Sequence, residues 1–403
     1  MKTILFAPAA YNLAETTRML EIARASKGKF EPHFISYGGQ FEEFIEKAGF
    51  PVHKLEPRLT PEKIEHIYKV DKGEKLGAFL TKDEIKARFQ SELVVFKKVN
   101  PAVTLTGFCL TIPYSTRIHG TPLVWVVQST WLLETGMGMI PQDAFGKLRP
   151  LIIGVLGGVT NFFVKLVLLN QMNRVAKTFG AQPIKSYFDY FSGDETLMAE
   201  PPGFSDLLHP PEHHHFIGPL IAREDFPIPQ EVLDIPHDKP IIYFAMGSSG
   251  TAEIIAILLQ GFEGQPYYVI SPVKKLVEKL DLKVPENVIL TEWLPAHKVN
   301  AMADISLIHG GIGTVMTAAL AGKPVVGIGM QPEQDANLQC LVRKGFAIRI
   351  PKRKASAERV LQAIETLLHD EEAKQKAQAF AQRVAKWDGP TQAAAFLVEH
   401  FGK

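Results

Sequence analysis

The stretch that decides the fold is residues 293–337, which read WLPAHKVNAMADISLIHGGIGTVMTAALAGKPVVGIGMQPEQDAN. At its centre a short apolar strand (305–308) leads into a glycine-rich turn (309–314), and a run of small residues typical of a helix follows. A turn of this kind points backbone N–H groups and the positive end of the helix dipole outwards, where both favour an anion. The stretch therefore predicts an α/β unit whose turn binds phosphate.

Polar and aromatic residues stand at both ends of this stretch. Trp293 precedes the strand, and the pair Glu333-Gln334 follows a second apolar strand at 324–328. In a parallel sheet the loops after neighbouring strands meet at one edge, so the turn and the pair should face one crevice. An acid beside an amide accepts and donates hydrogen bonds, as sugar hydroxyls require, and a Trp ring stacks on a nucleobase. A glycine turn alone is a weak signal, so the prediction rests on the combination.

The stretch resembles the donor-binding signature of family 1 glycosyltransferases, the nucleotide-sugar-dependent enzymes of the GT-B fold. That signature has a Trp-x-Pro opening, a His-Gly-Gly-x-Gly-Thr turn, a Gly-x-Pro and an Asp/Glu-Gln pair. The chain matches it with Trp293-Leu294-Pro295, residues 309–314, Gly322-Lys323-Pro324 and Glu333-Gln334. The resemblance implies an α/β protein of two doubly wound, Rossmann-like domains that face each other across a cleft.

The resemblance also implies which residues hold the donor. Trp293 would stack on the base, and Glu333 with Gln334 would hold the hexose hydroxyls. Thr317 stands where the family usually has a Glu that binds the ribose, so the choice between uridine and thymidine stays open. The diphosphate would be held by two turns, the first containing His309, Gly311, Gly313 and Thr314, the second containing Ser248 and Ser249.

The size and charge of the chain restrict the class of protein to which it can belong. Its 403 residues are 46% hydrophobic, enough for two domains with sizeable cores. The net charge of +1 argues against nucleic acid as a partner, because binding phosphates on that scale needs a basic face. The two cysteines, Cys109 and Cys340, are far apart, which suits a reducing compartment. The opening apolar run is too short for a signal peptide, so we expect a cytoplasmic protein.

Strands and helices alternate on both sides of a segment rich in Pro, Asp and Glu, which predicts two parallel sheets. With the resemblance, this gives an acceptor-binding domain (1–221), a linker (222–239) and a donor-binding domain (240–387). The last segment (388–403) resembles the family's terminal helix, which packs back on the first domain. The expected strands are 3–7, 33–37, 103–106 and 123–127 before the linker, and 241–246, 267–271, 288–290, 305–308, 325–328 and 347–350 after it.

The family's catalytic pair is missing from this chain. A His ahead of the first helix is usually the base and a later Asp orients it, but Glu15 stands at the first position and Gly107 falls near the second. Glu15 is therefore the candidate base, which would deprotonate an acceptor hydroxyl for attack on the anomeric carbon. Burial would have to raise its pKa, against the effect of the nearby helix N-terminus. The plainer interpretation is a favourable first-turn acid.

Two further segments invite a functional interpretation. Residues 151–169 are apolar except for a few polar positions, so we expect a buried or surface-apolar helix beside the acceptor cleft, with contact to a lipid acceptor or membrane surface as the alternative. The histidines at 213–215 are expected in a solvated loop, because adjacent residues on an extended chain do not converge on one metal ion. The chain has no Asp-x-Asp pair, so we expect neither a metal nor another cofactor.

The resemblance thus implies an inverting transferase that moves a hexose from a UDP-sugar, most simply UDP-glucose, to a hydroxyl of a small apolar, phenolic or lipid-like acceptor. Two alternatives stay open. A nucleotide-sugar 2-epimerase shares the architecture, and a binding protein could have kept the donor site and lost catalysis, since the usual His and Asp are absent.

Overall fold

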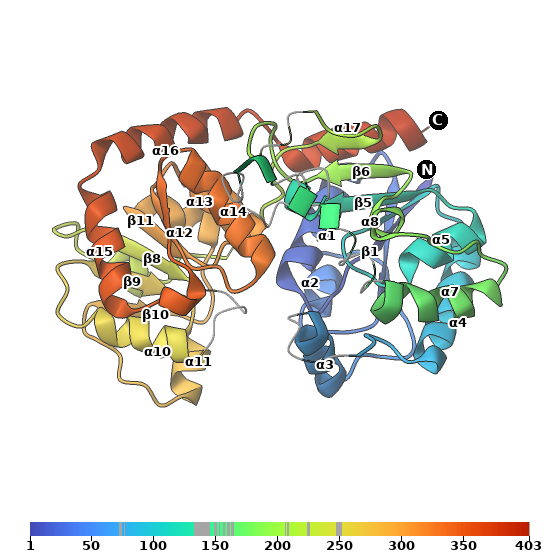
Figure 1. Ribbon diagram of the computed structural model, residues 1–403, viewed down its shortest axis with the longest axis horizontal. Coiled ribbons are helices and arrows are strands. Elements are labelled where there is room, and N and C mark those ends of the chain that lie inside the picture. Colours follow the sequence, from blue (N-terminus) through green and yellow to red (C-terminus); the bar gives the residue numbers. More distant parts are fainter. Residues whose placement is uncertain are drawn as a thin grey trace.

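The computed structural model describes residues 1–71, 75, 77–132, 146–148, 151–152, 154–155, 158, 162, 165–205, 207, 209–223, 226–246 and 252–402. These residues form two lobes, each built on one parallel sheet flanked by helices (Figure 1). The first half of the chain supplies one sheet and the second half supplies the other, as the sequence predicted.

The sheet of the first lobe has the strand order β3-β2-β1-β4-β5-β6-β7, and its strands pair in parallel. The central strands are buried along almost their whole length because helices cover both faces. The strands are β1 (Thr3–Ala7), β2 (Glu31–Ser36), β3 (Val52–Lys54), β4 (Val103–Thr106), β5 (Leu123–Val127), β6 (Glu195–Met198) and β7 (His214–Phe216). The sequence missed β3 and β6, which are short and follow polar segments.

The helices of the first lobe cover this sheet and bury two apolar clusters against it. Thr81 opens α4 with a capping box, in which its side chain accepts from the N–H of Glu84. The helices are α1 (Leu13–Ser26), α2 (Glu42–Lys47), α3 (Pro61–Asp71), α4 (Lys82–Val99), α5 (Ile112–His119), α7 (Asn170–Lys177) and α8 (Tyr187–Phe191), with a short 3-10 turn η1 (Ser129–Trp131) after β5.

The second lobe repeats the design with the strand order β10-β9-β8-β11-β12-β13. Its strands are β8 (Ile241–Ala245), β9 (Tyr268–Ser271), β10 (Val288–Leu290), β11 (Ile305–Ile308), β12 (Val325–Gly327) and β13 (Ala347–Arg349). Its helices are α9 (Gln230–Leu233), α10 (Ala252–Gly261), α11 (Lys274–Lys279), α12 (Ala296–Met302), α13 (Ile312–Ala321), α14 (Pro332–Arg343), α15 (Ala357–Leu368) and α16 (Glu371–Val384). The expected strands agree with these to within a residue at each end.

In each sheet the strand order reverses at one place. β1 lies between β2 and β4, and β8 lies between β9 and β11. Connections from such neighbouring strands run to opposite faces and open a crevice at their carboxyl ends. The two crevices are the places where each lobe should bind a ligand.

The last helix, α17 (Gly389–Phe401), returns to the first lobe (Figure 1). It packs against α1, and its Ala393 and Leu397 are fully buried in the core of that lobe. The end of the chain therefore ties the two lobes together.

Three expectations need correction or restriction. His214 and His215 do not lie in a loop, because both belong to β7, and His213 and His215 contact the Glu195 carboxylate at 3.2 and 2.8 Å. The segment 222–239 is more than a linker, since it contains α9, whose Val232 is fully buried in the second core. Residues 151–169 are described only in part, and Leu151, Val155, Phe162 and Leu166 among them are exposed. Within the described ranges, no helix has the length and apolarity that crossing a membrane requires.

Candidate active site

The glycine turn joins β11 to α13 in the predicted way. Gly310 has a φ of +90°, and a Cβ there would lie 2.6 Å from the carbonyl oxygen of Gln334, so glycine is required. Gly311 is the N-cap of α13, and no side chain in the described part of the chain caps this helix. A Cβ on Gly313 would meet no described atom within 4 Å, so the space beside it is open. The amino end of α13 has the geometry shared by anion-binding helix ends.

His309 lies directly against this turn. Its Nδ1 is 3.3 Å from the carbonyl oxygen of Ala245 at the end of β8, which assigns the ring proton to Nδ1 because a carbonyl only accepts. A Cβ on Gly311 would lie 2.8 Å from Nε2, so the glycine leaves room for the ring. Burial lowers the pKa of His309, and the bond to Ala245 partly opposes this shift. The Nε2 side of the ring therefore faces the turn as a weakly basic nitrogen.

Glu333 and Gln334 lie in the first turn of α14 but have different partners. The Oε2 of Glu333 accepts a hydrogen bond from the indole N–H of Trp131 at 2.7 Å and another from the amide of Gln128, both in the first lobe. Gln334 is only 2% exposed, and its Oε1 accepts from the backbone N–H of Met330 at 2.9 Å. Glu333 thus bridges the lobes, whereas Gln334 holds its own loop in place.

A second bridge runs from the first lobe to the glycine turn. The hydroxyl of Thr130 donates to Oδ1 of Asn337 at 3.1 Å, and Nδ2 of Asn337 donates to the carbonyl of Gly310 at 3.0 Å. No local sequence pattern marks Gln128, Thr130 or Trp131 as functional residues. Their position directly after β5, at the carboxyl edge of a parallel sheet, is the signal that could have found them.

Three of the remaining predicted donor residues follow β10 or β11 in the second lobe. Trp293 is 45% exposed, and its ring lies 6.4 and 6.1 Å from those of Phe41 and Phe44 in the first lobe. Thr317 is buried in α13, and its hydroxyl donates to the carbonyl of Gly313 at 2.7 Å. Thr314 is partly buried in the first turn of that helix. Ser248 and Ser249 lie outside the described residues.

Glu15 lies in the first turn of α1, where Asn12 caps the helix by accepting from the Glu15 N–H. Its Oε1 is 3.3 Å from an Nη of Arg18, which also donates to the carbonyl of Val126 at 3.1 Å. Its Oε2 is buried and has no hydrogen-bond partner among the residues that the structure describes. Burial raises the pKa of Glu15, Arg18 opposes this effect, and the Glu333 carboxylate of the other lobe adds to it.

Gly107 explains how Glu15 fits. A Cβ at position 107 would lie 1.9 Å from the Oε2 of Glu15 and 2.7 Å from its Cδ, so the carboxylate occupies the space that any side chain would need. The two departures from the family's pattern are therefore one feature of the structure. Glu15 fills the place left by the absent side chain at residue 107.

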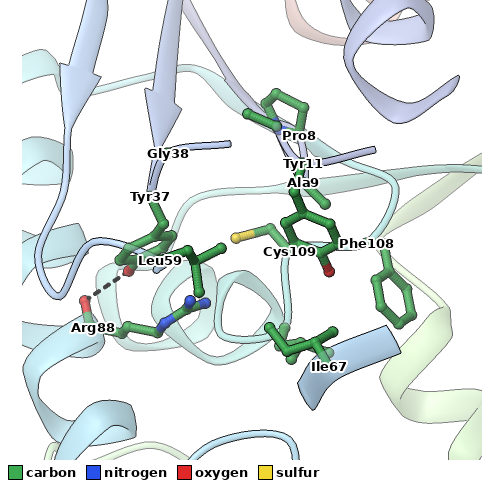
Figure 2. Close-up of a pocket in the computed structure, with 12 residues that line it drawn as sticks. Pro8, Ala9, Tyr11, Tyr37, Gly38, Leu59, Ile67, Arg88, Phe108 and Cys109 are labelled. Atoms are coloured by element: carbon green, nitrogen blue, oxygen red, sulfur yellow. Dashed lines mark hydrogen bonds between the residues drawn. The ribbon is translucent and has the colours of Figure 1, made fainter. Parts of the chain in front are cut away.

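A narrow pocket lies at the carboxyl edge of the first lobe's sheet (Figure 2). The loop after β1 forms one wall with residues 8–11, and the loop after β4 forms another with residues 108–110. Leu59 and Ile67 complete an apolar lining, to which Arg88 of α4 adds one charged side chain. The described residues contain no group of three or more His, Cys, Asp or Glu side chains that would hold a metal ion.

Comparison with known proteins agrees with this geometry. The family described as "Erythromycin biosynthesis protein CIII-like, C-terminal domain" matches residues 269–400. The chain is 26% identical over 388 residues to the "PGL/p-HBAD biosynthesis glycosyltransferase" of Mycobacterium tuberculosis (strain ATCC 25177 / H37Ra), covering 94% of this chain and 88% of that protein. It is 22% identical over 389 residues to a "PGL/p-HBAD biosynthesis rhamnosyltransferase" of Mycobacterium bovis (strain BCG / Pasteur 1173P2), covering 94% and 84%.

A solved structure shows the same architecture over the whole chain. The glycosyltransferase VinC, crystallised in complex with DTDP, superposes with a TM-score of 0.70 at 17% identity and covers 98% of both chains. The fold is therefore GT-B, with two parallel-sheet lobes around an interlobe site. The family-model match over residues 269–400, the glycosyltransferase relatives and this shared architecture together support a family 1 glycosyltransferase.

Proposed function

We propose that this protein is an inverting glycosyltransferase that moves a hexose from a nucleoside diphosphate sugar to a hydroxyl of a small apolar, phenolic or lipid-like acceptor. The observation that carries the proposal is the buried Oε2 of Glu15, which has no partner in the described part of the chain and lies opposite the donor-side Glu333. A carboxylate whose pKa is raised is a stronger base than an ordinary one, and this one lies between the two crevices.

The donor would lie on the second lobe. Its diphosphate would contact the N–H groups of Gly313 and Thr314 and the Nε2 of His309, with the helix dipole favouring the negative charge. Glu333 would exchange its bonds to the first lobe for bonds to sugar hydroxyls, and the exposed face of Trp293 would stack on the base. The dipole of α13, and His309 once it takes up a proton, would balance the charge of the diphosphate without a metal ion.

The transfer would be a single displacement. The acceptor hydroxyl loses its proton to Oε2 of Glu15, and its oxygen attacks the anomeric carbon from the face opposite the diphosphate. The new carbon–oxygen bond forms as the bond to the diphosphate breaks, and the nucleoside diphosphate leaves with the electron pair. Attack from the opposite face inverts the configuration at that carbon. Cross-lobe contacts such as Thr130 to Asn337 would keep water out during this step.

The residues of the donor site constrain the identity of the nucleoside less than they constrain the other parts of the donor. UDP-glucose is the expected donor, but Thr317 uses its proton on Gly313 and offers a ribose only a hydroxyl oxygen as acceptor. At such a position a deoxyribose loses less hydrogen bonding than a ribose does. Because VinC is described in complex with DTDP and one relative is named a rhamnosyltransferase, thymidine diphosphate sugars and deoxyhexoses are the competing donors.

The two alternatives have less support. Two of the matching relatives are named as transferases and a third as an inactive glycosyltransferase, and nothing in the comparisons favours a 2-epimerase. In a protein that only binds the donor, the buried Glu15 carboxylate over Gly107 would have no role. The two cysteines, Cys109 and Cys340, are buried, and a cytoplasmic location stays a prediction.

The test is to incubate the purified protein with UDP-glucose or dTDP-glucose and a panel of phenols and long-chain alcohols. The proposal expects products heavier by one hexose, and it expects Glu15→Gln to lose them while still binding the donor. Glu21→Gln is the matched control, because it removes a buried carboxylate on the same helix that pairs with Arg24 at 2.7 Å. An altered sugar without a glycoside, or thermal protection without turnover, would contradict transfer.

A further inference from the structure

Arg88 is an arginine whose charge has no ionic partner in the described structure. It is 4% exposed, and it lines the pocket of the first lobe. Its Nε has no hydrogen-bond partner among the described residues, and its guanidinium lies 3.8 Å over the ring of Tyr37. Figure 2 shows this side chain extending from α4 toward the apolar residues Leu59 and Ile67. A buried guanidinium that is not paired is costly, so it needs an explanation.

The polar groups around Arg88 do not neutralise it by contact. Glu92, one turn along α4, accepts hydrogen bonds from the hydroxyls of Tyr37, Thr111 and Ser115 instead. Burial raises the pKa of Cys109 to about 12, so this pocket-lining thiol carries no negative charge at neutral pH. Burial also raises the pKa of the Tyr37 hydroxyl, which therefore stays neutral. Glu92 is the one buried carboxylate in this group, and its oxygens are already used.

We propose that Arg88 binds a carboxylate of the acceptor, so that the substrates of this enzyme are hydroxy acids with an apolar, aromatic-sized body. This inference rests on the proposed transferase function and names the acceptor class of the same site. The planar guanidinium matches a carboxylate through two parallel N–H bonds. A doubly charged phosphate fits less well, because the single guanidinium balances only one negative charge.

The pocket places such an acceptor toward the base. Its walls, residues 8–11 and 108–110, are the segments directly next to α1 and Gly107, which position Glu15. An acceptor with its carboxylate on Arg88 and its body against Leu59, Ile67 and Phe108 would therefore have its far end near Glu15. The hydroxyl to be glycosylated would be on that far end.

The experiment compares hydroxyaryl carboxylates of increasing length, each with its carboxamide, which has the same shape and no charge. Turnover is measured as kcat/KM, and binding of each compound is measured by calorimetry. The native protein should prefer the acid of the best-fitting pair by about 10- to 100-fold, the range for a charged hydrogen-bond pair. Arg88→Met should bring the ratio of acid to amide kcat/KM to about one, and Arg88→Lys should keep part of the preference.

Arg58→Gln is the matched control, because Arg58 contacts the neighbouring Gly38 turn but already pairs with Glu42 at 2.7 Å. It should leave the ratio of acid to amide unchanged, and unaltered donor affinity in each variant shows that the protein is folded. An equal preference for acid and amide in the native protein, or an acid preference that survives Arg88→Met, overturns the inference. If no compound is glycosylated but Arg88→Met abolishes selective binding of the acid, the proposed function fails and the inference on Arg88 stands.

Discussion

Replacing Gly107 by alanine should displace the carboxylate of Glu15. The added Cβ would lie 1.9 Å from Oε2, whereas nonbonded carbon contacts need about 3.5 Å, so the carboxylate has to move by roughly 1.5 Å. Misplacing a general base on that scale should lower kcat by about 100- to 10,000-fold, or about 3 to 5 kcal/mol in activation free energy. Overpacking should also lower the free energy of unfolding by about 1 to 3 kcal/mol.

A double-mutant cycle with Glu15→Ala tests this reasoning. Truncating Glu15 removes the atoms that the new methyl group would meet, so Gly107→Ala should cost almost nothing in that background. Stability is measured by denaturant unfolding and activity by single-turnover transfer for all four proteins. Equal costs of Gly107→Ala with and without the Glu15 carboxylate would refute the account, as would a Gly107→Ala variant with native turnover.

Three further predictions concern pH and the interlobe contacts. The base acts in its ionised form and the pKa of Glu15 is raised, so the loss of kcat/KM on acidification should begin at a higher pH than the ionisation of an ordinary carboxyl would give. A loss of kcat/KM only at the pH of an ordinary carboxyl would contradict this. The pKa of His309 is lowered by burial, and a bound diphosphate should raise it. Calorimetry in buffers of different ionisation enthalpy should therefore show proton uptake on donor binding by the native protein and none by His309→Ala. If the native protein takes up no proton, His309 does not belong to the phosphate site. Trp131→Phe keeps a ring but loses the N–H bond to Glu333, so unfolding should become easier by about 1 to 3 kcal/mol, and an unchanged melting curve would show that this bridge contributes nothing.

The fold was predictable because its sequence pattern is local. The strand 305–308 and the turn after it follow from three apolar residues and three glycines, and the structure has β11 at 305–308. The strands that were not predicted, such as β3 and β6, are short, and they form because they pair with β2 and β5. The same holds for His214 and His215, which join β7 because β6 lies beside them.

The site residues that belong to one sequence motif were predictable, whereas those that come together from distant segments were less so. Glu15 and Gly107 were each recognised as departures, but only the folded chain shows that the carboxylate of one fills the space over the other. The partners of Glu333 follow β5 in the other lobe, and no local pattern marks them. Arg88 is one of several charged residues in α4, and its burial is a tertiary property that no local pattern marks.

The central claim is that Glu15 takes the proton from an acceptor while the donor lies on the amino end of α13. The most direct measurement is the anomeric configuration of the product formed from an α-linked nucleotide glucose, read from its proton NMR coupling, together with the rate for Glu15→Gln. The account predicts a β-glycoside, and a Glu15→Gln variant that binds donor normally but transfers at least 100 times more slowly. An α-glycoside, or full turnover without the Glu15 carboxylate, would contradict it.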